Sequence, residues 1–186
     1  EIMLAIFKRE FKSYFQNVIG WLFVAAVLAV FGLYFYVYNL TNGYPYLSYS
    51  LSSIAFIMVI AVPILTMRCF SEDRKNKVDQ LVLTAPVSVG KIVMGKFFAM
   101  AAVFTIDVAA ICLAPLVLSR FGAVPFGECY ISILGFWLFG CAMIAIGMFL
   151  SSITESQVIA AVVSFAVLFV GYMMKSIEGL VSSSGN

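Results

Sequence analysis

Nine of the twenty charged residues of this chain lie in one segment, residues 68–96. Acidic and basic side chains are mixed there, and Val78, Leu81 and Val82 add apolar positions. Mixed charges can orient a partner while apolar side chains supply contact area, so the segment predicts recognition of something in water. A loop that is merely solvated is the alternative. The charges at the centre of the segment are Glu72, Asp73, Arg74, Lys75, Lys77 and Asp79.

The end of this segment superficially matches a nucleotide-binding loop. Gly90 to Lys96 fits the first seven positions of the motif GxxxxGK[ST], but the eighth position is Phe97, which has no hydroxyl for magnesium. No strand is expected before it, and the segment runs directly into an apolar span. We therefore expect no ATPase site and no nucleotide cofactor in this chain.

Asp107 is the one acidic or basic residue in the middle of an apolar span. A carboxylate at that depth costs about 3 kcal/mol on insertion scales, and such residues usually face a bundle interior or a water-filled path. It could contact a substrate or a proton along a translocation path. It could equally be a protonated or hydrogen-bonded group that ties helices together, and the sequence leaves both readings open.

The sequence shows few residues that could form a metal site or an enzyme active site. The chain has no histidine, and its four cysteines show no CxxC spacing, so we expect buried thiols and no metal site. The absence of a convergent polar set across the spans disfavours an intramembrane enzyme. A net charge of only +2 disfavours nucleic acid as a partner.

The elements that position these residues are transmembrane helices. With 63% apolar residues and a mean hydropathy of +1.08, the chain is a membrane protein. Continuous apolar runs exclude a β-barrel and predict an all-α polytopic helical bundle. The five expected spans are 18–38, 47–67, 97–118, 130–150 and 157–174. A sixth span beyond Asn186 is expected in the full chain, and residues 1–186 are expected to form a single domain.

The distribution of lysine and arginine predicts the orientation. Nine of these residues precede the first span or lie between the second and third, and Arg120 and Lys175 fall on the other side. This bias places the N-terminus and the loop over 68–96 in the cytoplasm. The Tyr-rich segment 34–49 then faces outward, and we read the sequon at Asn39 within it as a chance match.

Residues 1–17 carry an apolar stripe with basic residues turned away from it. This pattern predicts an interfacial helix that lies on the inner leaflet, although a simple topology signal is the alternative. The stripe consists of Leu4, Phe7, Phe11 and Phe15.

Two smaller signals concern the helix ends. Pro63 and Pro115 each remove a helix hydrogen bond and predict kinks in the second and third spans. Ser152 stands three residues before Glu155, which is the spacing of a capping box for the start of the fifth span.

Several stretches together resemble the permease subunits of ABC-2-type exporters, particularly the branch that includes gliding-motility-associated permeases. The resemblance covers essentially the whole chain and is strongest between the second and third spans. It rests on Arg9-Glu10-Phe11, Thr66-Met67-Arg68, Glu72 and Arg74, Asp79 to Ser88, Ile92 to Ala99, and Leu150 to Gln157.

This resemblance implies a permease that dimerises, as a homodimer or heterodimer, and binds two ABC ATPase subunits made as separate chains. ATP and magnesium would then be cofactors of the partner, and the bacterial cytoplasmic membrane would be the location. The loop over 68–96 would carry the coupling helix that docks on the ATPase. The residues expected to contact the ATPase are Glu72, Asp73, Arg74, Lys75, Lys77, Asp79, Leu81 and Thr84.

An exporter driven by a separate ATPase is therefore the expected function, with a substrate that the sequence does not identify. The alternative is an ion-conducting helical bundle whose pore is lined by Asp107. Recovery of an ATPase together with the chain distinguishes the two, because only the exporter requires one.

Overall fold

The computed structural model describes residues 2–70 and 88–184, and every regular element among them is a helix. The expected all-α membrane fold is therefore confirmed. In chain order the elements are α1 (Ile2–Gln16), α2 (Val18–Tyr34), the π-helix η1 (Phe35–Thr41), α3 (Ser48–Thr66), α6 (Val89–Ile111), α7 (Ala114–Leu118), α8 (Phe126–Ile153) and α9 (Gln157–Ser184).

Five helical segments of the described chain are long and apolar enough to cross a membrane, which confirms the five predicted spans. The third begins at Val89 and not at Phe97, because α1 packs extensively against the first turns of α6 and supports a helix that is longer than its apolar run. The five segments are Val18–Thr41, Ser48–Thr66, Val89–Leu118, Phe126–Ile153 and Gln157–Ser182.

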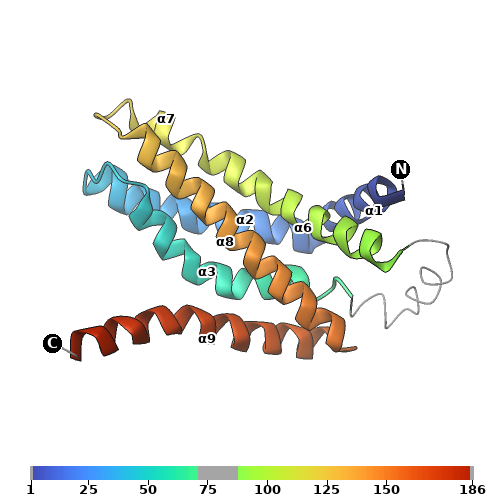
Figure 1. The fold of residues 1–186 in the computed structure, drawn as a ribbon. Coiled ribbons are helices and arrows are strands. Elements are labelled where there is room, and N and C mark those ends of the chain that lie inside the picture. The colour runs from blue at the N-terminus through green and yellow to red at the C-terminus, as the bar shows by residue number, and fades with distance from the viewer. Residues whose placement is uncertain (1, 71–87, 185–186) are drawn as a thin grey trace.

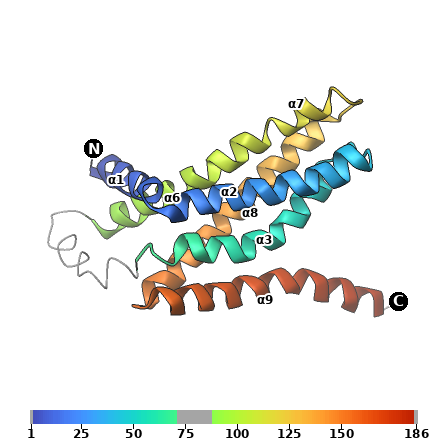
Figure 2. The same ribbon diagram turned by 180° about the vertical axis from the view of Figure 1, so that it is seen from behind.

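The core lies where α2, α3, α6 and α8 meet. Both α2 and α8 pack against α3 and α6, as the two opposite views of Figures 1 and 2 show. Phe104 of α6 is fully buried between two other rings, with centroid distances of 6.5 Å to Phe23 and 5.5 Å to Phe136. Dispersion contacts of such large side chains stabilise helix association in lipid, where the hydrophobic effect gives little.

The last helix lies at the edge of this bundle. α9 packs against α8 and α3 and runs along the outside of the other helices (Figure 1). Only 17% of its most apolar stretch is buried, compared with 56% of the corresponding stretch of α3. Its remaining face is apolar and suits contact with lipid or with another membrane protein.

The two prolines act differently. Pro63 lies inside α3, one turn before the helix ends at Thr66. Pro115 cannot donate a backbone hydrogen bond, and the third span is interrupted just before it, between the end of α6 at Ile111 and the start of α7 at Ala114. The kink predicted at Pro115 thus falls at an interruption of the helix, whereas the kink predicted at Pro63 falls within a continuous α3 and stays a prediction.

The sequon at Asn39 has a structural role. Its side chain is almost fully buried, and its amide Nδ2 donates to the carbonyl oxygens of Tyr44 at 2.8 Å and Tyr46 at 3.1 Å. Ser50 Oγ donates to Asn39 Oδ1 at 2.7 Å. These bonds join η1 to the start of α3 and leave the amide inaccessible to a glycosyltransferase, in agreement with a chance match.

The two ends of the bundle differ in charge. The start of α6 and the ends of α3 and α8 lie at the same end as α1, whereas α7 and the loop before α3 lie at the other (Figures 1 and 2). The first end carries six of the eight basic residues that the structure describes; the other two are Arg120, at the second end, and Lys175, in α9. This is the asymmetry on which the predicted orientation depends. The six are Lys8, Arg9, Lys12, Arg68, Lys91 and Lys96.

Candidate functional site

The predicted ATPase-contacting residues lie outside the described part of the chain, in residues 71–87. They are Glu72, Asp73, Arg74, Lys75, Lys77, Asp79, Leu81 and Thr84. The structure does describe both flanks of this segment: Met67 to Phe70 follow α3, and Val89 begins α6. The site is therefore built from these flanks and from the helices that hold them.

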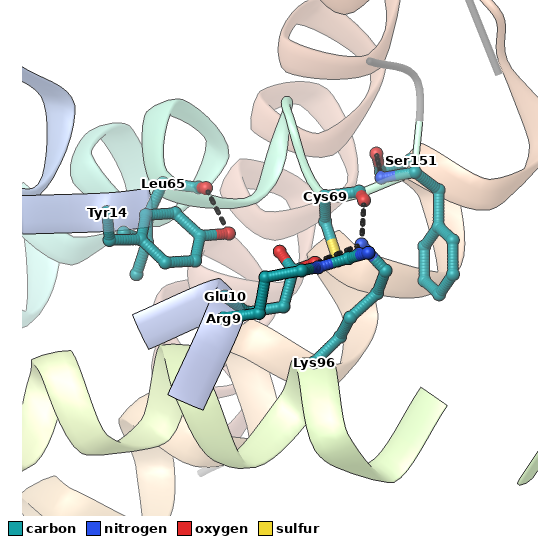
Figure 3. Close-up of polar contacts among 8 residues, drawn as sticks. Arg9, Glu10, Tyr14, Leu65, Cys69, Lys96 and Ser151 are labelled. Atoms are coloured by element: carbon teal, nitrogen blue, oxygen red, sulfur yellow. Dashed lines mark hydrogen bonds and ion pairs between the residues drawn. The ribbon is translucent and has the colours of Figure 1, made fainter. Parts of the chain in front are cut away.

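Lys96 is the centre of a polar cluster at these flanks, shown in Figure 3. Its side chain is only 3% exposed, although the sequence placed it in a solvated loop. Its Nζ donates to the carbonyl oxygen of Cys69 at 2.9 Å and lies 3.3 Å from Oε1 of Glu10. It also lies 5.4 Å from the centroid of the Phe70 ring, within cation–π range. Lys96 is therefore buried, although it belongs to the charged segment that the sequence predicts to meet a partner in water.

A buried ammonium is costly unless hydrogen bonds and an opposite charge replace its hydration. Lys96 has both, from two different elements: Glu10 belongs to α1, and Cys69 follows α3. The cation therefore joins α1 and the end of α3 to the start of α6. We call Glu10, Cys69, Phe70, Lys96 and Ser151 the Lys96 cluster.

Glu10 is further held by its neighbour Arg9. Arg9 Nη2 lies 2.7 Å from Glu10 Oε1, and the Arg9 side chain is 54% exposed, whereas that of Glu10 is 15% exposed. An exposed pair of this kind contributes little, usually below about 1 kcal/mol. The bond to Lys96 is the stronger constraint on Glu10, because it is shielded from water.

Ser151 connects α8 to the same cluster. The backbone N–H of Phe70 donates to Ser151 Oγ at 3.3 Å, and Ser151 Oγ donates to the carbonyl oxygen of Met67 at 3.4 Å. Both bonds are long, but Ser151 is fully buried, so bulk water cannot replace these bonds if they are lost. The residues just before the undescribed segment are thus held from α6 and from α8.

The capping box predicted at Ser152 is wrong. Because α8 continues to Ile153 and α9 begins at Gln157, Ser152 is still inside α8, and its Oγ donates to the carbonyl oxygen of Phe149 at 2.6 Å. The hydroxyl that links α8 to another element here is that of the neighbouring Ser151.

Two glycines allow the helices around the cluster to approach closely. A Cβ at Gly95 of α6 would lie 2.9 Å from Cγ2 of Ile6 in α1, and a Cβ at Gly147 of α8 would lie 2.5 Å from Oγ1 of Thr66 in α3. Side chains at either position would force the helices apart. Tyr14 adds a long hydrogen bond of 3.5 Å from its hydroxyl to the carbonyl oxygen of Leu65.

A small polar cavity adjoins the cluster between α1 and the end of α3. Its volume is about 30 Å³, enough for about one water molecule, and its lining includes Glu10, Tyr14 and Arg68. Arg68, the first charged residue of the predicted loop, therefore faces α1.

The apparent nucleotide-binding motif lies in a regular helix. Residues 90–97 form the first turns of α6 and are packed against α1. A phosphate-binding loop requires non-helical backbone whose N–H groups point at the phosphate. This segment cannot adopt that geometry while α6 is intact.

Asp107 is apart from the Lys96 cluster, farther along α6. It is 0% exposed, and neither carboxylate oxygen has a hydrogen-bond partner among the described residues. It follows Phe104 by three residues and so shares the face of α6 that packs into the core. The predicted place of Asp107 in a translocation path stays a prediction, because its carboxyl group is enclosed in this structure.

The sequence did not predict the Lys96 cluster, although most of its members lie in stretches that the sequence singles out. Glu10, Lys96 and Ser151 each lie within a stretch that carries the family resemblance, but none was expected to contact the others. A lysine flanked by Gly95 and by an aromatic pair at Phe97 and Phe98 was the one local sign of burial.

Comparison with known families gives one match. The family model described as "ABC-2 family transporter protein" matches residues 34–180, most of the chain. This confirms the ABC-2 resemblance, while the gliding-motility branch stays a prediction. No curated protein and no solved structure gives a significant match.

Proposed function

The chain belongs to the ABC-2 family of transporter proteins, and on this premise we propose that it is the permease subunit of an exporter driven by a separate ABC ATPase. Two ATPase copies bind a permease dimer, in which the second permease is a copy of this chain or a related one. ATP and magnesium are cofactors of the ATPase. The permease moves its substrate by alternating access between inward-open and outward-open states.

The observation that carries this proposal is the Lys96 cluster. It attaches Cys69 and Phe70, next to the proposed ATPase-contacting segment, to α1 through Glu10, to α6 through Lys96 and to α8 through Ser151. A displacement of that segment by the ATPase would therefore act on several helices together. Packed elements with short polar links transmit such a displacement better than a flexible loop.

The proposed location is the bacterial cytoplasmic membrane, with the N-terminus in the cytoplasm. Support comes from the basic residues gathered at the end of the bundle that contains α1. In this orientation the proposed coupling segment faces the compartment that contains ATP.

Double charge reversal at the coupling segment tests the proposal. The chain is expressed together with candidate ABC ATPase subunits from its own genome, purified through a tag on the permease, and assayed for ATPase content and for vanadate-sensitive hydrolysis in nanodiscs. We expect the unmodified complex to hold two ATPase copies for each permease dimer. Reversal of both Glu72 and Arg74, to Arg and Glu respectively, should abolish recovery or coupling, because it opposes the charges of the docking surface.

The matched control reverses Arg120 and Glu128, which are both exposed at the opposite end of the bundle. This variant should retain the ATPase and its activity. Equal loss in both variants, or an unmodified permease without the ATPase, would contradict the proposed function.

The alternative of an ion channel predicts conductance from the chain alone. A pore lined by Asp107 would have to form in another conformation or in an assembly, because Asp107 has no exposed surface here. Planar-bilayer recordings of the purified chain decide the matter: steady conductance that Asp107→Asn changes would favour the channel.

A further inference from the structure

An apolar groove runs between α1 and the side of α6, with α8 at its far end. Its volume is about 460 Å³, within the range of small-ligand sites. The groove is separate from the Lys96 cluster. Its lining residues are Met3, Leu4 and Phe7 of α1, Phe98, Ala101, Ala102 and Thr105 of α6, and Trp137 of α8.

The few polar groups of this groove are already bonded to each other. Trp137 Nε1 donates to Thr105 Oγ1 at 3.0 Å, and Thr105 Oγ1 donates to the carbonyl oxygen of Ala101 at 2.6 Å. The walls therefore present hydrocarbon and aromatic surface to an occupant. A sugar, a nucleotide or an extended peptide would lose its hydration there without replacement hydrogen bonds.

Cations flank the groove at the end of the bundle that contains α1. Lys91 precedes Phe98 by seven residues, or two helical turns, so it lies on the same face of α6 and about 10 Å further toward that end. Lys8 follows Phe7 on α1 and is one turn from Leu4. Both lysines are exposed, and neither forms an ion pair with another residue that the structure describes.

We propose that this groove binds an acyl chain of an anionic phospholipid, whose headgroup contacts Lys91 and Lys8. An apolar groove whose two main walls, α1 and α6, each carry an exposed lysine near the lining residues matches the amphipathic form and the charge of such a lipid. A zwitterionic lipid fits the groove equally well but gains less from the lysines. The inference depends on the contact between α1 and α6 and not on the transport cycle.

A bound lipid has a consequence for the Lys96 cluster. The groove and Glu10 both belong to α1, and the groove and Lys96 both belong to α6. A lipid that contacts both helices therefore stabilises the same α1–α6 interface that the bond between Glu10 and Lys96 holds.

Native mass spectrometry of the purified chain tests this proposal. The protein is reconstituted in nanodiscs with equal parts of phosphatidylglycerol and phosphatidylcholine, released into mild detergent, and analysed for retained lipid. We expect enrichment of phosphatidylglycerol by roughly five-fold for each contacting lysine, which corresponds to about 1 kcal/mol per base near an anionic headgroup. The double variant Lys8→Gln with Lys91→Gln should retain both lipids equally.

Two further variants separate headgroup from groove. Arg120→Gln removes an exposed cation at the opposite end and should leave the preference unchanged. Ala102→Phe fills the groove and should remove the retained lipid whatever its headgroup, and the lysine variants decide the matter if it fails to fold.

Three results would overturn the proposal. The first is equal retention of the two lipids by the unmodified protein. The second is a loss of preference in Arg120→Gln as large as that in the lysine variant. The third is unchanged lipid in Ala102→Phe together with loss of a dimer, which would mean that a second copy of the chain covers the groove.

Discussion

Lys96 and Asp107 are two buried ionisable residues on one helix, and their surroundings differ completely. Lys96 is 3% exposed and contacts a carboxylate, a carbonyl oxygen and an aromatic ring. Asp107 is 0% exposed, and its carboxylate oxygens have no hydrogen-bond partner in the described chain. Burial of a charged group thus has no single meaning. Lys96 links helices, whereas Asp107 has a hydrogen-bonding capacity that no described residue uses.

The difference follows from position along α6. Lys96 is near the end of the bundle, where α3 has ended at Thr66 and the carbonyl oxygen of Cys69 accepts from Lys96 Nζ. Its long side chain can reach that oxygen and Glu10 together. Asp107 is in the middle of the span, where the backbone groups of neighbouring helices already bond within their own helices. Its short side chain can reach only what packs directly against it.

The largest expected effect in this comparison is that of Lys96→Met. The substitution keeps the apolar stem but leaves Glu10 and the carbonyl oxygen of Cys69 without their cation. We expect the free energy of unfolding to fall by about 3–5 kcal/mol, as when one partner of a buried pair is removed. Thermal unfolding in detergent measures the change.

Arg9→Gln is the matched control, because Arg9 contacts the same Glu10 oxygen from an exposed position. It should cost less than about 1 kcal/mol. A similar loss of stability in both variants would show that Lys96 is not the main link between the helices, and would contradict the contrast drawn with Asp107.

Asp107→Leu should raise the free energy of unfolding, in contrast to Lys96→Met. It replaces a buried carboxyl group that has no hydrogen-bond partner among the described residues by an apolar side chain of similar shape, so we expect stability to rise by about 1–3 kcal/mol. The same unfolding measurement tests it, and a transport assay adds a second readout. A stable variant with lost transport would place the function of Asp107 in another conformation, whereas a destabilised variant would mean that the carboxyl group has a structural partner.

Ser151→Ala should give the smallest of the three effects. Loss of its two long hydrogen bonds is expected to cost about 1 kcal/mol and to accelerate hydrogen exchange at the amide of Phe70. Ser152→Ala is the matched control, because that hydroxyl donates to the carbonyl oxygen of Phe149 in its own helix. Exchange at Phe70 that does not distinguish the two variants would remove α8 from the Lys96 cluster.

Much of the fold could be predicted because the signals are local. A run of about 20 apolar residues has no satisfactory state in a membrane other than a helix, so each of the five spans follows from its own residues. Phe97 argued against a nucleotide site in the same local way, and the kink predicted at Pro115 falls at the interruption between α6 and α7.

The candidate site could be predicted less well. Lysine is a residue type that is usually exposed in loops, and only the packing of α1 against α6 explains why Lys96 is buried. Ser152 has the spacing of a capping box, but α8 continues past it. In both cases a neighbouring element overrides a short-range pattern.

By itself the sequence determined that this protein is a membrane-spanning helical bundle with its charge gathered between the second and third spans, because hydrophobicity and chain length act locally. Only the tertiary structure decided which buried polar groups have partners. Lys96 bonds a carbonyl oxygen 27 residues away, and Phe70 bonds a hydroxyl 81 residues away. Hydrogen bonds need atoms within about 3 Å, and at these separations the packing of whole helices sets that distance.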